Sequence, residues 1–157
     1  MRGTLSVLDS RTRRRRLAEF QRLCREQGIP LTSQRLIILK TVLALGSHPT
    51  ADQIFASPPV RRARISRATV YRTLENLVQL GAITKACHPG GVIRYDGRIE
   101  LHHHLICLRC DAVLDIADVR LDRIPIPDTS SLGFDVKDFR VQLRGLCRRC
   151  RRLEDKR

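Results

Sequence analysis

Two pairs of cysteines constrain the fold of this chain more than any other feature. Cys107 pairs with Cys110 and Cys147 with Cys150, and 36 residues lie between the two pairs. Four thiolates form a closed tetrahedral set for Zn²⁺, and closing so long a loop through a metal strongly favours the folded state. The alternative is two coincidental pairs of buried cysteines. The matched spacing and a neighbouring histidine cluster favour a structural zinc site that staples a unit of strands.

Charge divides the 157-residue chain unevenly. Residues 1–97 hold 17 Lys and Arg against 6 Asp and Glu, a net charge of +11, whereas residues 98–157 hold 13 against 10, a net charge of +3. A basic first half suits a polyanionic partner, and a solvated charge excess is the alternative. No run of about 18 apolar residues and no apolar leader segment is found. We therefore expect a cytoplasmic protein without membrane association.

The first half has the pattern of helices followed by two short strands. Apolar spacing and end signals predict helices over 13–27, from Thr32 to Gly46, from Thr50 to Pro58 and Pro59, and from Ser66 to Gly81. Strands are predicted over 82–86 and 92–95, hinged at Pro89-Gly90-Gly91. This order is the winged helix-turn-helix plan, with the helix after Ser66 in the recognition position.

The second half has the pattern of strands, so the chain as a whole is predicted to be α+β. Strands are expected over 101–108, 112–116, 134–136 and 139–146. A helix is expected over 118–123, and Pro125 and Pro127 interrupt the pattern after it.

Three adjacent histidines precede the first cysteine pair. Strand alternation puts His102 and His104 on one face and His103 on the other. Two imidazoles at this spacing can bind one ion, with Asp96 and Asp115 as candidate oxygen ligands. Such a mixed set suits Fe²⁺ or Mn²⁺ as well as Zn²⁺. A solvated histidine patch is the alternative.

The predicted recognition helix carries polar side chains on the face opposite its apolar stripe. Arginine and tyrosine there can contact base edges, thymine methyl groups and phosphates, and an ordinary solvated face is the alternative. The basic residues Arg61, Arg62 and Arg64 just upstream favour DNA. The candidate DNA-contacting residues are Arg35, Arg67, Thr69, Tyr71 and Arg72.

Several motifs in order make the chain resemble the ferric uptake regulator family over about residues 15–150. They are LTSQRLIIL from Leu31, HPTADQI from His48, SRATVYRTLENL from Ser66, RYD from Arg94, HHHLICLRC from His102 and GLCRRC from Gly145. The resemblance implies a homodimer that binds double-stranded DNA, with A·T-rich palindromic operators. It also implies an N-terminal tail (1–12), a winged-helix domain (13–97) and a small α/β dimerisation and metal-sensing domain (98–157).

The resemblance further implies two metal sites in each chain. Cys107, Cys110, Cys147 and Cys150 would hold structural Zn²⁺. A regulatory Fe²⁺ or Mn²⁺ would be bound by His48, Asp96, His102, His104 and Asp115. This second ion would lock the two domains at the angle that fits two half-sites and so act as a corepressor.

The regulatory set is most similar to that of the peroxide-responsive branch, because the iron-responsive branch more often has Glu at the position of Asp115. In the peroxide branch a ligand histidine is oxidised, and the matching positions are His48 and His102. The alternative is an iron- or zinc-responsive repressor without peroxide sensing. The chain departs from the family pattern in two places. It has no histidine over 135–140, where iron-responsive members often have a ligand of an additional metal site, and it has Pro30 where many members have Lys.

Two other classes of protein fit part of the pattern. A redox metal on His and Asp resembles a small oxygenase or hydrolase centre, but no substrate pocket or separate general base is evident, so we expect no enzyme. A zinc-stapled interaction module would explain the cysteines but not the basic first half. A steep fall of DNA affinity with rising salt would distinguish a DNA-binding protein from both.

Overall fold

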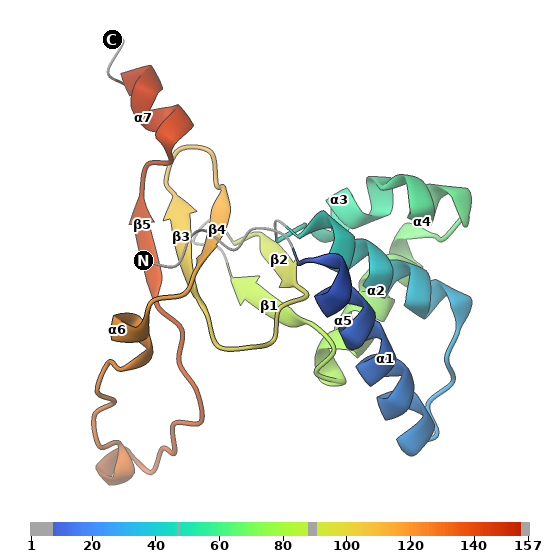
Figure 1. Ribbon diagram of the computed structural model, residues 1–157, viewed down its shortest axis with the longest axis horizontal. Coiled ribbons are helices and arrows are strands. Elements are labelled where there is room, and N and C mark those ends of the chain that lie inside the picture. The colour runs from blue at the N-terminus through green and yellow to red at the C-terminus, as the bar shows by residue number, and fades with distance from the viewer. Residues whose placement is uncertain (1–7, 47, 88–90, 155–157) are drawn as a thin grey trace. The chain divides into compact units, whose positions relative to one another are not determined.

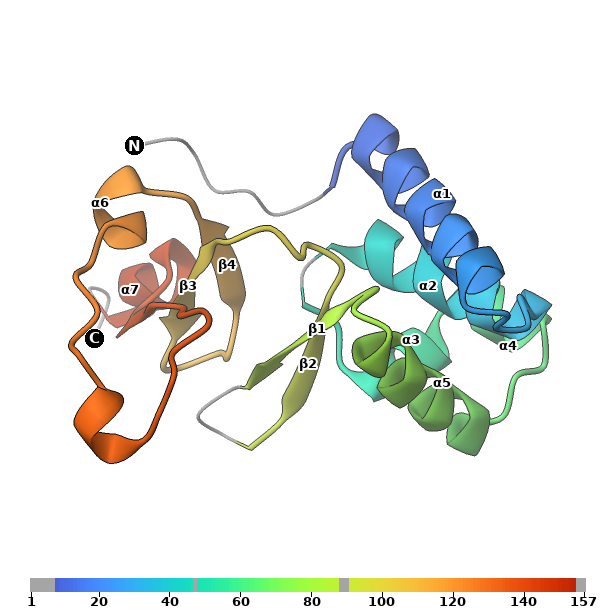
Figure 2. The ribbon, with the colours of Figure 1, turned by 90° about the horizontal axis from the view of Figure 1, so that it is seen from below.

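The computed structural model describes residues 8–46, 48–87 and 91–154. It has the predicted α+β class, and it divides into two compact units on either side of the step from Ile99 to Glu100. Figures 1 and 2 show the first unit in blue to yellow-green and the second in yellow to red. Within the described residues, no helix is long and apolar enough to cross a membrane.

The first helix, α1 (Ser10–Glu26), begins three residues before the predicted start at residue 13. The cause is Asp9, whose carboxylate accepts a hydrogen bond from the Thr12 backbone N–H at 2.8 Å. This cap satisfies one of the open donors at the helix start. Part of the segment expected as an N-terminal tail is therefore helical.

The remaining helices of the first unit follow the predicted end signals with one correction. Thr32 caps α2 (Ser33–Leu45), Thr50 caps α3 (Ala51–Ala56) in a capping box with Gln53, and Ser66 caps α5 (Arg67–Gln79). The prolines after α3 do more than end it, because Pro58 starts a separate short helix, α4 (Pro58–Arg62). Proline suits a first helical turn, where its missing N–H has no partner to lose.

The core of the first unit is mainly aliphatic, and it fixes which face of each helix points outward. Ile38, Ile54, Val70, Leu74 and Leu77 have no measurable exposure. Figures 1 and 2 show α2, α3 and α5 packed together. Because one side of each helix is buried in this way, the polar residues on the opposite sides are turned to solvent.

The two strands after α5 form an antiparallel hairpin, the predicted wing. They are β1 (Thr84–Cys87) and β2 (Ile93–Asp96), each shifted by one or two residues from the expected ranges. The predicted hinge at 89–91 lies largely outside the described residues. Strand β2 also forms a bridge from Arg94 to Thr50, so the wing is tied to the loop that leads into α3.

The second unit is built on a three-stranded sheet in the order β4-β3-β5. Strand β3 (His103–Cys107) pairs antiparallel with β4 (Val113–Ile116) and parallel with β5 (Gln142–Gly145). The predicted helix near 118–123 is present as α6 (Val119–Asp122), capped by Asp118. Two further elements were not predicted, the 3₁₀ turn η1 (Ser130–Leu132) and helix α7 (Arg148–Glu154).

The strands expected over 134–136 and 139–146 need correction. Residues 134–136 have no regular structure, and β5 covers only four residues of the longer range. Phe134 is exposed, and the backbone of this segment is paired with no strand in the part of the chain that the structure describes. Three alternating residues without a partner strand cannot complete their backbone hydrogen bonds as a sheet.

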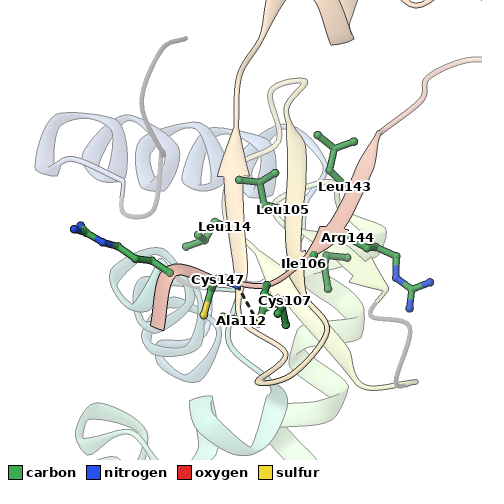
Figure 3. Close-up of a pocket in the computed structure, with 11 residues that line it drawn as sticks. Leu105, Ile106, Cys107, Ala112, Leu114, Leu143, Arg144 and Cys147 are labelled. Atoms are coloured by element: carbon green, nitrogen blue, oxygen red, sulfur yellow. Dashed lines mark hydrogen bonds between the residues drawn. The ribbon is translucent and has the colours of Figure 1, made fainter. Parts of the chain in front are cut away.

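Register gives the sheet two chemically different faces. Leu105 lies opposite Leu114 on one side and Leu143 on the other, so the three leucines form one row across the sheet (Figure 3). His104 lies opposite Asp115 on the other face, since successive strand residues point in opposite directions. The row of leucines makes one face mainly apolar, and the other face presents His104 and Asp115.

Candidate metal centres and DNA-facing helix

The four predicted zinc ligands come together in the second unit. Their sulfur atoms lie within 4.8 Å of one another, and the Cys110 and Cys147 sulfurs are 3.7 Å apart. Two sulfurs bound to one zinc at about 2.3 Å in a tetrahedron lie about 3.8 Å apart, whereas a disulfide bond is about 2.05 Å long. The spacing and the four thiols therefore fit zinc.

Backbone geometry prepares these thiols for a metal. The Cys147 backbone N–H donates to the Cys107 sulfur at 3.3 Å, and this hydrogen bond is the largest of several that lower the pKa of the Cys107 thiol to about 6. Burial raises the pKa of the Cys150 thiol to about 12. Because thiolates are the form that binds metal, the hydrogen bond favours the metal-binding form of Cys107, whereas binding at Cys150 requires the loss of its proton to the solvent.

In the first unit, His48 and Asp96 form a buried pair. The His48 Nε2 atom lies 3.2 Å from an Asp96 carboxylate oxygen, and both side chains are under a tenth exposed. Two ligand atoms at about 2.1 Å from a common ion lie about 3 to 3.5 Å apart. The pair therefore has the spacing of two ligands on one metal.

Hydrogen bonds between the 48–50 loop and β2 hold this pair in place. The Arg94 guanidinium donates to the His48 carbonyl at 3.1 Å, and the Tyr95 backbone N–H donates to the Pro49 carbonyl at 2.9 Å. His48 itself has φ +51°, in the left-handed region that non-glycine residues seldom adopt. Such a conformation persists only where its surroundings hold it, and it is concentrated at functional sites.

In the second unit, His102, His104 and Asp115 form another buried group. The His102 Nε2 atom lies 3.8 Å from an Asp115 carboxylate oxygen, and the two histidine rings contact edge to face with centroids 4.8 Å apart. All three residues are less than 5% exposed. They form a nitrogen and oxygen set on adjacent strands.

The tautomer of His102 follows from its backbone contact. Its Nδ1 lies 2.7 Å from the Glu100 carbonyl oxygen, which can only accept, so Nδ1 carries the hydrogen. In a neutral ring the lone pair is then on Nε2, which lies on the side of Asp115. This carbonyl–histidine arrangement is common behind metal-binding imidazoles.

The donor chemistry separates the two kinds of site. Four thiolates suit Zn²⁺, and the imidazole and carboxylate groups suit Fe²⁺ or Mn²⁺ as well as Zn²⁺.

The predicted alternation of the three histidines is also confirmed. His103 points away from its two neighbours, accepts at Nδ1 from the Val141 backbone N–H at 3.0 Å, contacts Asp122 at 3.0 Å and stacks on Phe139. Those contacts already engage both ring nitrogens of His103, so it ties α6 and the segment before β5 to the sheet.

Four of the five predicted DNA-contacting residues lie on α5, and they differ in exposure. Arg67, Tyr71 and Arg72 are exposed, whereas Thr69 is half-buried. The Thr69 hydroxyl lies 2.9 Å from the Ser66 hydroxyl and so belongs to the cap of the helix. Arg35 lies on α2, half-buried, and its guanidinium donates to the Pro30 carbonyl.

The contacts of two acidic residues with α5 residues or wing residues were not predicted. Asp52 on α3 accepts from Arg67 at 2.7 Å and from Tyr71 at 3.2 Å. Glu75 on α5 accepts from Lys85 at 2.6 Å and from the Tyr95 hydroxyl at 3.3 Å. Burial raises the pKa of Tyr95 to about 12, so this hydroxyl stays protonated as a donor. No sequence pattern identifies which distant residue a surface carboxylate will contact.

The chain is similar to known proteins in sequence. A sequence profile described as the ferric uptake regulator family matches residues 26–144. The peroxide-responsive repressor PerR of Staphylococcus epidermidis is 29% identical over 127 residues, which are 81% of this chain and 85% of that protein.

Two solved structures have a similar fold. The ferric uptake regulator Fur of Helicobacter pylori superposes with a TM-score of 0.69 at 20% identity, over 88% of this chain and 93% of that one. A zinc-bound manganese uptake regulator superposes with a TM-score of 0.61 at 28% identity, over 81% and 97%. The profile covers well over half of the sequence, and the winged-helix and second-unit architecture agrees with it. The chain belongs to the ferric uptake regulator family, whose members are metal-responsive transcription regulators.

Proposed function

We propose that this protein is a metal-dependent, sequence-specific DNA-binding repressor that senses peroxide. The main support is a connection within the first unit, which links the ligand pair His48 and Asp96 to helix α5. Asp96 follows Tyr95 directly, and Tyr95 donates a hydrogen bond to Glu75 on α5. Asp96 is therefore one residue away from a contact that reaches the proposed DNA-reading helix, and His48 lies 3.2 Å from Asp96.

One regulatory ion would be shared by both ligand groups. His48 and Asp96 would come from the first unit, and His102, His104 and Asp115 from the second. Support comes from the donor set, which is the one expected for Fe²⁺ or Mn²⁺, and from the burial of all five residues. Sharing one ion would restrict the two units to one relative orientation, which would favour the DNA-binding state by population shift. The zinc site would be structural, because its four thiolates leave no open position.

Peroxide sensing would use the ligand histidines themselves. Bound Fe²⁺ would supply the redox chemistry through which one oxygen atom of hydrogen peroxide enters an imidazole C–H bond and the other leaves as water. His48 and His102 are the proposed acceptors, and each lies beside a carboxylate that would share the ion. An oxidised imidazole is a weaker ligand, so the ion and then the DNA would be released. The similarity to PerR supports this finer proposal.

A repressor that responds to iron or zinc without peroxide chemistry is the second candidate. It is favoured by the donor set alone, because nitrogen and oxygen ligands accept several divalent ions. The two candidates differ in one outcome, the survival of DNA binding after exposure of the Fe²⁺ form to peroxide.

The DNA-binding proposal is tested with duplexes that the protein selects from a random-sequence pool in the presence of Mn²⁺. We expect selection of A·T-rich palindromes and binding that requires the added metal. Affinity should also fall steeply with rising salt as phosphate-bound cations are released. Failure to enrich any sequence, with or without metal, would contradict the proposal.

A homodimer would use the apolar face of the second unit. Leu105, Leu114 and Leu143 form its central row, and together with Leu146 they line a cavity of about 290 Å³. Leu143 is 43% exposed and Leu146 is 37% exposed. Adjacent exposed leucines on a sheet are typical of an interface, and a second copy would match the two-fold symmetry of a palindromic operator.

Replacing Leu143 with glutamate should produce a monomer. A carboxylate in a closely packed apolar interface loses its hydration without gaining a partner. Sedimentation equilibrium should then give half the mass of the wild-type assembly, with the zinc content unchanged. Leu132→Glu is the matched control, because Leu132 is 80% exposed and lies in η1 of the same unit. Dimers formed equally well by both variants would exclude this face.

A further inference from the structure

A carboxylate on α3 contacts two of the residues proposed to read DNA. Asp52 Oδ1 accepts a hydrogen bond from the Arg67 guanidinium at 2.7 Å and another from the Tyr71 hydroxyl at 3.2 Å. Arg67 and Tyr71 are four residues apart on α5, so they lie on the same side of that helix. One acidic group therefore joins both exposed side chains.

The contact is fixed by how the two helices are anchored. The capping box of Thr50 and Gln53 sets the first residue of α3, and Ala51 and Ile54 are buried in the core. Asp52 is thereby directed outward. On α5 the Ser66 cap and the buried Val70 fix the rotation of the helix in the same way. Asp52 contacts Arg67 and Tyr71 because the core fixes the position and rotation of both helices.

Folding stability does not account for this arrangement. The Asp52 and Arg67 side chains are 57% and 61% exposed, and exposed ion pairs contribute little to stability because water screens them. The larger consequence is for the guanidinium. In the protein without DNA, one of its donors and the Tyr71 hydroxyl are directed to a carboxylate on the surface that would face the phosphates.

Specific and non-specific DNA would affect this contact differently. On a random duplex, Arg67 would exchange Asp52 for a phosphate, while the carboxylate would still repel the neighbouring phosphates. On an operator, Arg67 would keep its Nη2 contact with Asp52 and direct its remaining donors to a base edge, and a good bidentate contact discriminates strongly between bases. The same negative charge thus weakens non-specific binding more than specific binding.

We propose that Asp52 is a specificity-determining residue, which holds Arg67 and Tyr71 together and penalises binding to non-operator DNA. It would act on DNA through Arg67 and would be a positioning residue with no base contact of its own. The inference rests on the proposed use of α5 as the DNA-reading helix.

The experiment compares two duplexes and two charge-removing variants. The full-length, zinc- and Mn²⁺-loaded protein is titrated with a duplex selected by the wild type and with a scrambled duplex of the same composition. Asp52→Asn keeps the shape of the side chain and removes its charge. Glu26→Gln is the matched control, because Glu26 is 60% exposed and is paired with Arg22 on α1 at 3.8 Å.

We expect Asp52→Asn to bind the scrambled duplex about five- to tenfold more tightly and the selected duplex less than about threefold more tightly. Glu26→Gln should leave the ratio of the two affinities unchanged. In an Arg67→Ala background, Asp52→Asn should no longer change the ratio, because the carboxylate acts through that guanidinium. Asp52 in the first turn of α3 also interacts with the helix dipole, but that effect changes stability and not the ratio.

Three results would overturn the inference alone. An unchanged ratio in Asp52→Asn would remove the specificity role. An equal change of the affinity ratio in Glu26→Gln would show that the effect comes from net charge. A full effect of Asp52→Asn in the Arg67→Ala background would show that Asp52 does not act through Arg67. If the wild type selects no duplex, the proposed function fails and this inference fails with it. That result differs from the other three, in which the wild type still selects a duplex.

Discussion

Replacing Cys107 with serine should remove zinc and unfold the second unit, residues 100–154. The four thiols lie within 4.8 Å of one another, and they join the β3–β4 turn to the start of α7 across 36 intervening residues. Structural zinc contributes about 10 to 16 kcal/mol of apparent binding free energy in small domains. The sheet of this unit has only three short strands, so its apolar contacts alone cannot replace that contribution.

Metal analysis and amide NMR spectra measure this effect. We expect one zinc per chain in the wild type, none in Cys107→Ser, and collapse of the amide resonances of the second unit to unfolded positions. Cys24→Ala is the control, because Cys24 is equally buried but belongs to the core of the first unit. It should lower stability by about 1 to 2 kcal/mol and keep the zinc. A Cys107→Ser protein that retains its zinc and dispersed resonances would contradict the assignment.

Replacing His102 with alanine should abolish metal-dependent DNA binding while leaving the zinc in place. His102 has its Nδ1 on the Glu100 carbonyl and its Nε2 3.8 Å from Asp115, so the variant removes an oriented ligand. Changes next to a metal ligand already cost about 10- to 100-fold in affinity. Loss of the ligand itself should weaken Mn²⁺-dependent DNA binding by about 100-fold or more.

Anisotropy titrations with a selected duplex at increasing Mn²⁺ measure the loss. Asp115→Ala should behave in the same way as His102→Ala. Asp128→Ala is the matched control, because Asp128 is an exposed carboxylate of the same unit that accepts from the Ser130 backbone N–H. Wild-type Mn²⁺ dependence in both His102→Ala and Asp115→Ala would exclude this group as the regulatory site.

Local signals in the sequence predicted most of the first unit. Thr32, Thr50 and Ser66 each cap the helix expected of them, and Gly46 ends its helix in the left-handed conformation. Such signals are strong because the required atoms lie within four residues of one another. The separate helix from Pro58 was missed because the same proline that ends one helix also suits the first turn of the next.

Long-range pairing could not be predicted in the same way. Strand β5 has four exposed residues, and only its parallel partner β3 defines it as a strand. The contacts of Asp52 with Arg67 and of Glu75 with Tyr95 likewise join residues 15 to 20 positions apart. The metal ligands were identifiable because their chemistry restricts residue type, whereas a surface carboxylate has no such restriction until its neighbours are known.

The most direct test of the central proposal compares the Fe²⁺ and Mn²⁺ forms before and after mild peroxide. The protein is purified without oxygen, and its binding to a selected duplex is followed by anisotropy, with mass spectrometry of the recovered chain. We predict that both metals support binding and that peroxide abolishes it only for Fe²⁺, with one added oxygen on His48 or His102. Fe²⁺-dependent binding that survives peroxide, with both histidines unmodified, would contradict peroxide sensing and favour an iron- or zinc-responsive repressor.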